Sequence, residues 1–152
     1  MKRFEFRLEP VRRFRAGVEK ERKREFAEAQ AAYERELALL NGLRNEESKV
    51  VRELRGELNG RCDAHRVTAA WSRLELLRKR IQIQEARTQE AQRHLEEKRS
   101  ALVEATKERK VMDRLRELRW EDHLYELGRE EQGFLDEVAG GRFVLRRLGA
   151  EE

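Results

Sequence analysis

The fold of this chain is decided by the stretch Leu-Asn-Gly-Arg-Cys-Asp at residues 58–63. Asn59-Gly60 is a strong turn signal because both residue types tolerate backbone angles that helices avoid. Asp63, which follows, is a good N-cap for a second helix. No proline occurs after Pro10, and proline breaks helices more strongly than any other residue. One bend in an otherwise uninterrupted sequence predicts two long helices joined near residue 62.

On both sides of this bend, apolar residues recur mostly three or four positions apart, which is the spacing of one helix face. The sequence therefore predicts an all-α fold in which two long helices form an antiparallel coiled-coil hairpin. The chain is expected to be a single coiled-coil domain over residues 1–152, whose elements are helix 8–58, turn 59–66, helix 67–139 and a short tail 140–152. The tail is expected because a Gly140-Gly141 pair is typical of a helix C-terminus.

The composition is typical of a coiled coil with a narrow buried seam and a large solvent-exposed surface. Charged residues make up 43% of the 152 residues and hydrophobic residues 38%, below the usual apolar share of about 45–50% in globular domains. No apolar run approaches the roughly 18 residues that a membrane span needs, and the first residues do not resemble a signal peptide. A single cysteine, Cys62, cannot form an internal disulfide. These features predict a soluble cytoplasmic protein.

Charge predicts the register of the hairpin. A bend at residue 62 pairs positions whose numbers sum to about 124, which places Val50 opposite Leu74 and Leu43 opposite Ile81. Residues 1–24 carry ten Lys/Arg and four Glu, whereas residues 111–137 carry nine Asp/Glu and four Arg. Folding the chain at the bend sets these opposite charges side by side, whereas a parallel homodimer would set like against like. Antiparallel pairing within one chain is favoured.

Two asymmetries remain after this pairing. The hairpin tip, residues 49–81, carries nine Lys/Arg and four Asp/Glu. At the other end, residues beyond about 124 have no counterpart on the first helix, yet they include Leu124, Tyr125, Leu127, Phe134, Leu135 and Val138. Apolar residues on an unpaired helix predict either a docking surface or a fold-back onto the amino terminus.

The sequence contains none of the usual signatures of catalysis or nucleotide binding. No GxxxxGK phosphate loop, GxGxxG turn or HExxH zinc motif occurs. Cys62 and His65 offer two possible zinc ligands, whereas zinc normally needs at least three from the protein. Basic residues alternate with acidic ones, unlike the concentrated basic face of a nucleic-acid-binding protein. We expect no catalytic residues, no cofactor, no metal site and no nucleic-acid partner, and a structural or adaptor role.

Three stretches resemble the flagellar export protein FliJ family. Residues 4–11, Phe-Glu-Phe-Arg-Leu-Glu-Pro-Val, are similar to its amino terminus. Residues 107–115, Lys-Glu-Arg-Lys-Val-Met-Asp-Arg-Leu, are similar to its basic segment before an acidic-leucine step. Glu131-Gln132 followed by residues 135–137, Leu-Asp-Glu, is similar to its carboxy-terminal element. The resemblance spans nearly the whole chain, in the right order and at the right separation.

The resemblance implies a non-enzymatic, soluble component of the flagellar type III protein export apparatus, which serves motility. FliJ-like proteins are coiled coils similar to the central stalk of rotary ATP synthases. Their implied partners are the hexameric export ATPase FliI, the membrane-embedded export gate protein FlhA and the chaperones of late substrates. The protein is then expected at the cytoplasmic face of the inner membrane, near the gate.

Under this interpretation each end of the hairpin has its own partner. The open end is expected to enter the ATPase ring through Phe134, Leu135, Asp136 and Val138. The basic tip is expected to approach the gate through Arg66, Trp71, Arg73 and Arg78. Two alternatives stay open, namely the stalk protein of a type III secretion injectisome and a basic coiled-coil nucleic-acid-binding protein.

Overall fold

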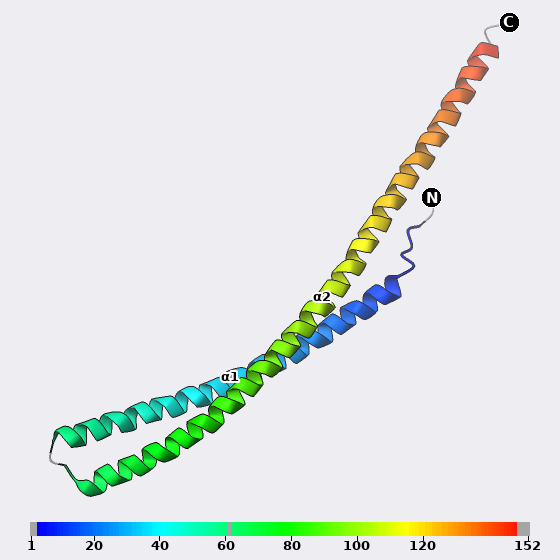
Figure 1. Ribbon diagram of the computed structural model, residues 1–152. Helices are drawn as coiled ribbons and strands as arrows, with labels where there is room; N and C mark the ends of the chain where they lie inside the picture. The colour runs from blue at the N-terminus through cyan, green and yellow to red at the C-terminus, as the bar shows by residue number, and fades with distance from the viewer. Residues whose placement is uncertain (1–2, 61, 149–152) are drawn as a thin grey trace. The chain divides into compact units, whose positions relative to one another are not determined.

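The computed structural model describes residues 3–60 and 62–148 of the chain, with side chains described up to residue 143. It contains two helices, α1 from Glu9–Asn59 (51 residues) and α2 from Ala64–Leu148 (85 residues), and these described ranges contain no strand. The two helices are joined by a short connection and run antiparallel on either side of it (Figure 1). The predicted all-α antiparallel hairpin is confirmed.

The connection is shorter than predicted because Asp63 caps α2 directly. The backbone nitrogen of His65 donates a hydrogen bond to the Asp63 side chain at 3.0 Å, and the backbone nitrogen of Val67 donates to the Asp63 carbonyl at 3.0 Å. An N-cap side chain that accepts from the second helical residue satisfies one of the free amides of the first turn. The predicted cap is therefore confirmed, and α2 begins at Ala64 rather than at residue 67.

The predicted stop at Gly140-Gly141 is wrong, because α2 continues to Leu148. Among the described glycines, none has a positive φ, whereas a glycine that ends a helix usually adopts the left-handed conformation. A glycine inside a helix costs about 1 kcal/mol relative to alanine, which weakens the helix without ending it. The predicted tail 140–152 is thus helical as far as residue 148, and its last four residues lie outside the described part of the chain.

Contacts between the helices divide the chain into two parts. The hairpin part is Val18–Ala105, and the end part consists of Met1–Gly17 and Thr106–Glu152. The hairpin part holds a core cluster of buried apolar side chains near the bend, formed by Val50, Leu54, Leu74 and Leu77. Val50 and Leu74 lie in this one cluster, as the predicted register requires, and Leu43 packs against it.

A polar layer interrupts the apolar seam of the hairpin part. Gln84 and Thr88 are buried, with 6% of each residue exposed. The Gln84 side-chain amide donates to the backbone carbonyl of Glu36 at 3.1 Å and also to its carboxylate. The Thr88 hydroxyl donates to the Gln84 carbonyl at 2.8 Å. Buried polar groups are stable when they are bonded in this way, and a bonded polar layer favours one register of the two helices over its neighbours.

Ion pairs between α1 and α2 follow the predicted register in both parts. In the hairpin part, Lys98 contacts Glu25 at 3.1 Å and Arg78 contacts Glu47 at 3.0 Å. The residue numbers of these two pairs sum to 123 and 125, close to the predicted 124. In the end part, Arg12 contacts Asp113 at 3.2 Å, a pair that also sums to 125. In each part, α1 and α2 are thus paired in the predicted register.

Candidate partner-binding surfaces

The three tip arginines predicted to contact a partner lie at the tip, but each is paired with a glutamate of α1. Their partners and distances are Arg66 with Glu57 at 3.3 Å, Arg73 with Glu53 at 3.9 Å and Arg78 with Glu47 at 3.0 Å. The arginine side chains remain between 57% and 72% exposed. These arginines therefore help to hold the two helices together, in addition to any role at the surface.

Four other basic residues at the tip leave their charge available. Among the described Lys and Arg residues of the tip, those with an exposed side chain and no ion pair or hydrogen bond are Lys49, Arg55, Lys79 and Arg80. Counting charges along the sequence could not separate these four from the paired arginines, because pairing depends on which residue stands across the seam. The predicted Trp71 is 52% exposed, and Leu76, also at the tip, is 51% exposed. The tip thus combines free cations with accessible apolar side chains.

The second predicted surface lies on the part of α2 that has no counterpart on α1, because α1 begins only at Glu9. We call residues 124–143 the α2 extension. The apolar residues predicted there are accessible, with Phe134 66%, Leu135 64% and Val138 39% exposed, and Asp136 is exposed beside them. Leu124 and Tyr125 are 49% and 70% exposed. The alternative of a fold-back that buries these residues is not seen in the described part of the chain. Apolar side chains gathered on an unpaired helix are typical of a docking surface.

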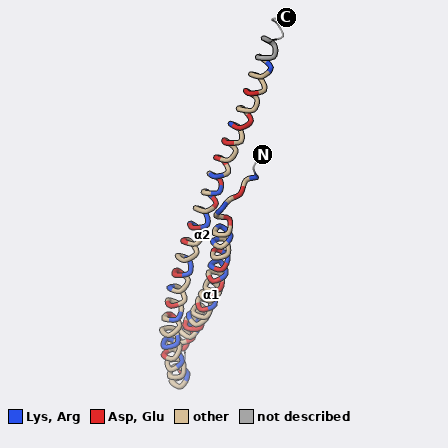
Figure 2. The backbone as a smooth tube through the Cα atoms, turned by 90° about the vertical axis from the view of Figure 1, so that its right-hand side faces the viewer, with Lys and Arg blue, Asp and Glu red and all other residues tan. Residues whose placement is uncertain are grey.

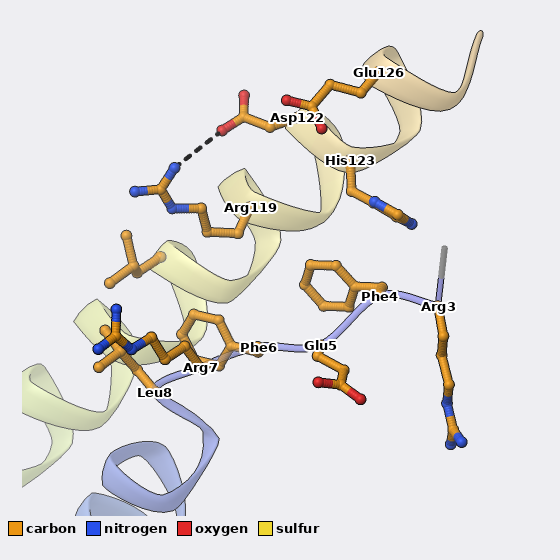
Figure 3. A pocket seen from close by; sticks show the side chains of 11 residues that line it. Arg3, Phe4, Glu5, Phe6, Arg7, Leu8, Arg119, Asp122, His123 and Glu126 are labelled. Atoms are coloured by element: carbon orange, nitrogen blue, oxygen red, sulfur yellow. Dashed lines mark ion pairs between the residues drawn. The ribbon is translucent and has the colours of Figure 1, made fainter. Parts of the chain in front are cut away.

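An aromatic contact that the sequence did not predict marks where the paired seam ends. Residues 3–8 form a strap that precedes α1 and runs along α2 (Figure 3). The Phe4 ring meets Trp120 edge-on with ring centroids 5.0 Å apart, and lies 5.5 Å from the His123 ring. Such edge-to-face pairs contribute about 0.5–1.5 kcal/mol beyond the area they bury. The signal that could have shown it is the Phe-Glu-Phe alternation at residues 4–6, which places both rings on one side of an extended segment.

Beside the strap lies an open groove of about 780 Å³. Phe4 and Phe6 point toward α2, whereas Glu5 points away from it (Figure 3). The opposite wall is α2, where Arg119 contacts Asp122 at 3.8 Å. Cations and carboxylates alternate around the groove, so its lining shows no preference for a ligand of one charge.

Below the strap, a network of charged side chains fixes the first turns of α1. Arg12 contacts Glu9 at 2.8 Å and Asp113 at 3.2 Å, and Arg116 contacts Glu9 at 3.8 Å. The hydrogen bond from Arg12 is the main cause that lowers the pKa of Glu9 from 4.5 to about 2, and Arg13 adds to it. The Arg12 guanidinium has its own pKa raised, by Glu9 first and Asp113 second. Arg109 also pairs with Asp113. This network ties the start of α1 to α2.

The described residues show neither a metal-binding cluster nor a membrane-spanning segment. Within 3–60 and 62–148, no three His, Cys, Asp or Glu side chains gather closely enough to hold a metal ion. Cys62 is exposed. Neither helix, over its described length, has a stretch both long and apolar enough to cross a bilayer. The features that stand out are therefore the tip, the α2 extension and the strap.

Comparison with known proteins agrees with the architecture. The family described as flagellar FliJ protein matches residues 4–148, a range that runs from the strap through both helices to the last described residue of α2. No curated protein matches the chain, and no solved structure does. A match over this range covers far more than half of the sequence. The chain therefore belongs to the FliJ family of flagellar export-associated coiled-coil proteins.

Proposed function

We propose that this protein is a non-enzymatic stalk that binds the hexameric export ATPase and connects it to the membrane-embedded export gate protein and to substrate chaperones. The observation that carries the proposal is the α2 extension, an exposed apolar helix surface that α1 does not cover, in a chain of the FliJ family. A protein that joins two assemblies needs two separate surfaces. The hairpin supplies one at its tip and one at its open end.

The α2 extension is assigned to the ATPase. Phe134 and Leu135 are each about two-thirds exposed, and large apolar side chains of this kind are the usual anchors of protein interfaces. The residues lie beyond α1, so a partner can surround this helix without displacing the paired seam. Binding at this site would favour assembly of the ATPase ring, because a ligand that binds the assembled form stabilises it.

The tip is assigned to the gate. Free cations at Lys49, Arg55, Lys79 and Arg80 give it a positive field, which speeds association with an acidic protein surface. Trp71 supplies an exposed aromatic anchor beside them. This assignment would place the protein at the cytoplasmic face of the inner membrane through its partner. Chaperones of late substrates are the third class of partner, and we assign no residues to them.

The experiment that tests the proposal compares two variants of the full chain against both partners. The first ends at residue 123, which deletes the α2 extension and leaves the strap and the paired helices. It is expected to keep its helical hairpin, lose binding to the purified ATPase and keep binding to the gate's cytoplasmic domain. ATPase binding that survives this deletion would contradict the assignment of the open end.

The second variant changes Lys49, Arg55, Lys79 and Arg80 to Glu. These positions make better test sites than Arg66, Arg73 and Arg78, whose reversal would set Glu against Glu across the seam and so change the contacts between the helices as well as the surface. The variant should bind the gate more weakly, with a reduced dependence on salt, and should bind the ATPase normally. Loss of ATPase binding with normal gate binding would show that the two ends are assigned the wrong way round.

A further inference from the structure

The apolar seam of α2 continues beyond the last residue that the rest of the chain covers. Phe4 packs against Trp120 and His123, and among the described residues of the end part none crosses α2 after the strap (Figure 1). At 100° per residue, Tyr125 and Phe143 fall on another face of α2. The other five large apolar side chains of the next turns fall within an arc of about 100° that also contains Trp120. These are Leu124, Leu127, Phe134, Leu135 and Val138. This stripe is half of a coiled-coil interface without its second helix.

Acidic residues border the stripe. The α2 extension, residues 124–143, carries five Asp/Glu and two Arg, and Glu121 and Asp122 come just before it. Figure 2 shows acidic positions along this length of α2. On the helical projection, Glu121 and Glu130 flank the stripe on its two sides and Glu131 lies within it. Flanking charges of this kind select the charge of the partner helix in a coiled coil.

The end part already shows which kind of helix α2 accepts. Next to the extension, the acidic Asp113 and Glu108 of α2 are paired with Arg12 and Arg15 of α1. From this precedent and the charge of the extension, we propose that residues 124–143 dock a basic amphipathic helix supplied by a partner protein. That helix would lie along the stripe and place its Lys and Arg against Glu121 and Glu130.

The glycines of the extension support this proposal independently. A Cβ placed on Gly128, Gly133, Gly140 or Gly141 would meet nothing within 4 Å, so packing within the chain does not require glycine at these positions. Each costs about 1 kcal/mol of helix stability relative to alanine, and helices without tertiary packing are marginal at this length. A partner helix that packs on the stripe would supply the missing stabilisation. Because folding then accompanies binding, the glycines would weaken the complex and make it reversible.

This inference rests on the proposed function only in placing a protein partner at the open end, and its test does not use the ATPase. The probes are two designed helical peptides of about four heptads with the same Leu and Ile seam. One carries Lys and Arg beside the seam, and the other carries Glu. Binding to the full chain is measured by fluorescence anisotropy of the labelled peptide, and hydrogen exchange of residues 124–143 reports where it binds.

The basic peptide is expected to bind at least about tenfold more tightly than the acidic one, to slow hydrogen exchange in 124–143 and to lose affinity with salt. Equal binding of the two peptides, or protection elsewhere in the chain, would overturn the proposal. Slow exchange in 124–143 that appears without peptide as the protein concentration rises would also overturn it, because a second copy would then be the occupant.

Matched variants make the test sharper. Glu130→Lys together with Glu131→Lys should reverse the preference between the two peptides. Gly133 and Gly140 lie on the face opposite the stripe, so changing each to Ala should tighten the basic peptide about fivefold without touching the interface. Gly42→Ala is the control, because it too has open space around its Cβ but lies in α1 of the hairpin part, and it should leave peptide binding unchanged. Weaker binding of the basic peptide by the Gly133 and Gly140 variants would contradict the idea that residues 124–143 gain helix stability when the partner helix binds.

The two proposals can fail separately. If the chain selects the basic peptide but does not bind the ATPase, the proposed function is wrong and the basic-helix proposal stands. A chain that binds the ATPase through residues 124–152 but does not distinguish the peptides would overturn the basic-helix proposal alone.

Discussion

Replacing Leu74 with alanine tests whether the core near the bend holds the hairpin together. Leu74 is 2% exposed and belongs to the cluster that joins Val50 and Leu54 of α1 to Leu77 of α2. A buried Leu→Ala change removes the transfer free energy of the side chain and leaves a cavity, a total of about 2–5 kcal/mol. The two helices meet along a narrow seam with solvent close on both sides, which lets the site relax. We therefore expect about 3 kcal/mol, near the lower half of this range.

Leu76→Ala is the matched control, because it makes the same chemical change two residues away on α2 at a side chain that is 51% exposed. It should change the free energy of unfolding by less than about 0.5 kcal/mol. The assay is urea denaturation followed by circular dichroism at 222 nm, with hydrogen exchange at residues 43–81 as a local readout. A loss of about 3 kcal/mol corresponds to an increase of roughly a hundredfold in the unfolded fraction. Equal effects of the two substitutions would refute the proposed packing of α1 against α2.

Two further predictions concern buried and charged polar groups. Because the pKa of Glu9 is lowered to about 2, chiefly by Arg12, its carboxylate should stabilise the end part above about pH 4.5, and this contribution should be lost as pH falls toward 2. An NMR titration should find the Glu9 midpoint near 2 and find it raised in Arg12→Ala; a midpoint near 4.5 in the unchanged protein would contradict the contact. Gln84→Ala should cost about 1–3 kcal/mol, because it removes a buried donor to the backbone of α1. The exposed Gln82→Ala should cost almost nothing in the same denaturation assay, and similar losses from both would contradict the polar layer.

The sequence was sufficient for the features that depend on local chemistry and on charge. The turn just after Asn59 follows from a glycine, which disfavours helix, and the cap at Asp63 follows from a side chain that bonds to its own backbone, so neither needs tertiary information. The register followed from the opposite charges of the two distant ends. The pair between Arg12 and Asp113 is one of the contacts that this argument required.

The features that sequence reasoning missed depend on what stands across the seam or on backbone angles. Gly140-Gly141 ends a helix only when one glycine takes a positive φ, and the sequence does not determine that angle. Arg66 and its neighbours at the tip are paired because glutamates of α1 face them, which a count of charges cannot show. The strap contact between Phe4 and Trp120 joins residues more than a hundred positions apart. Phe4 precedes α1, so the helical spacing of apolar residues could not predict it.

In the proposed function, the α2 extension is the surface through which this protein acts on the export ATPase. The most direct measurement is the ATP hydrolysis rate of the purified ATPase as the full chain is added, with Phe134→Ala compared against Phe14→Ala. The two phenylalanines are almost equally accessible, at 66% and 64% exposed, but Phe14 lies on α1 and Phe134 on the extension. Phe134→Ala should lose most of the stimulation and Phe14→Ala should keep it. Full stimulation by Phe134→Ala, or equal losses in both variants, would contradict the account.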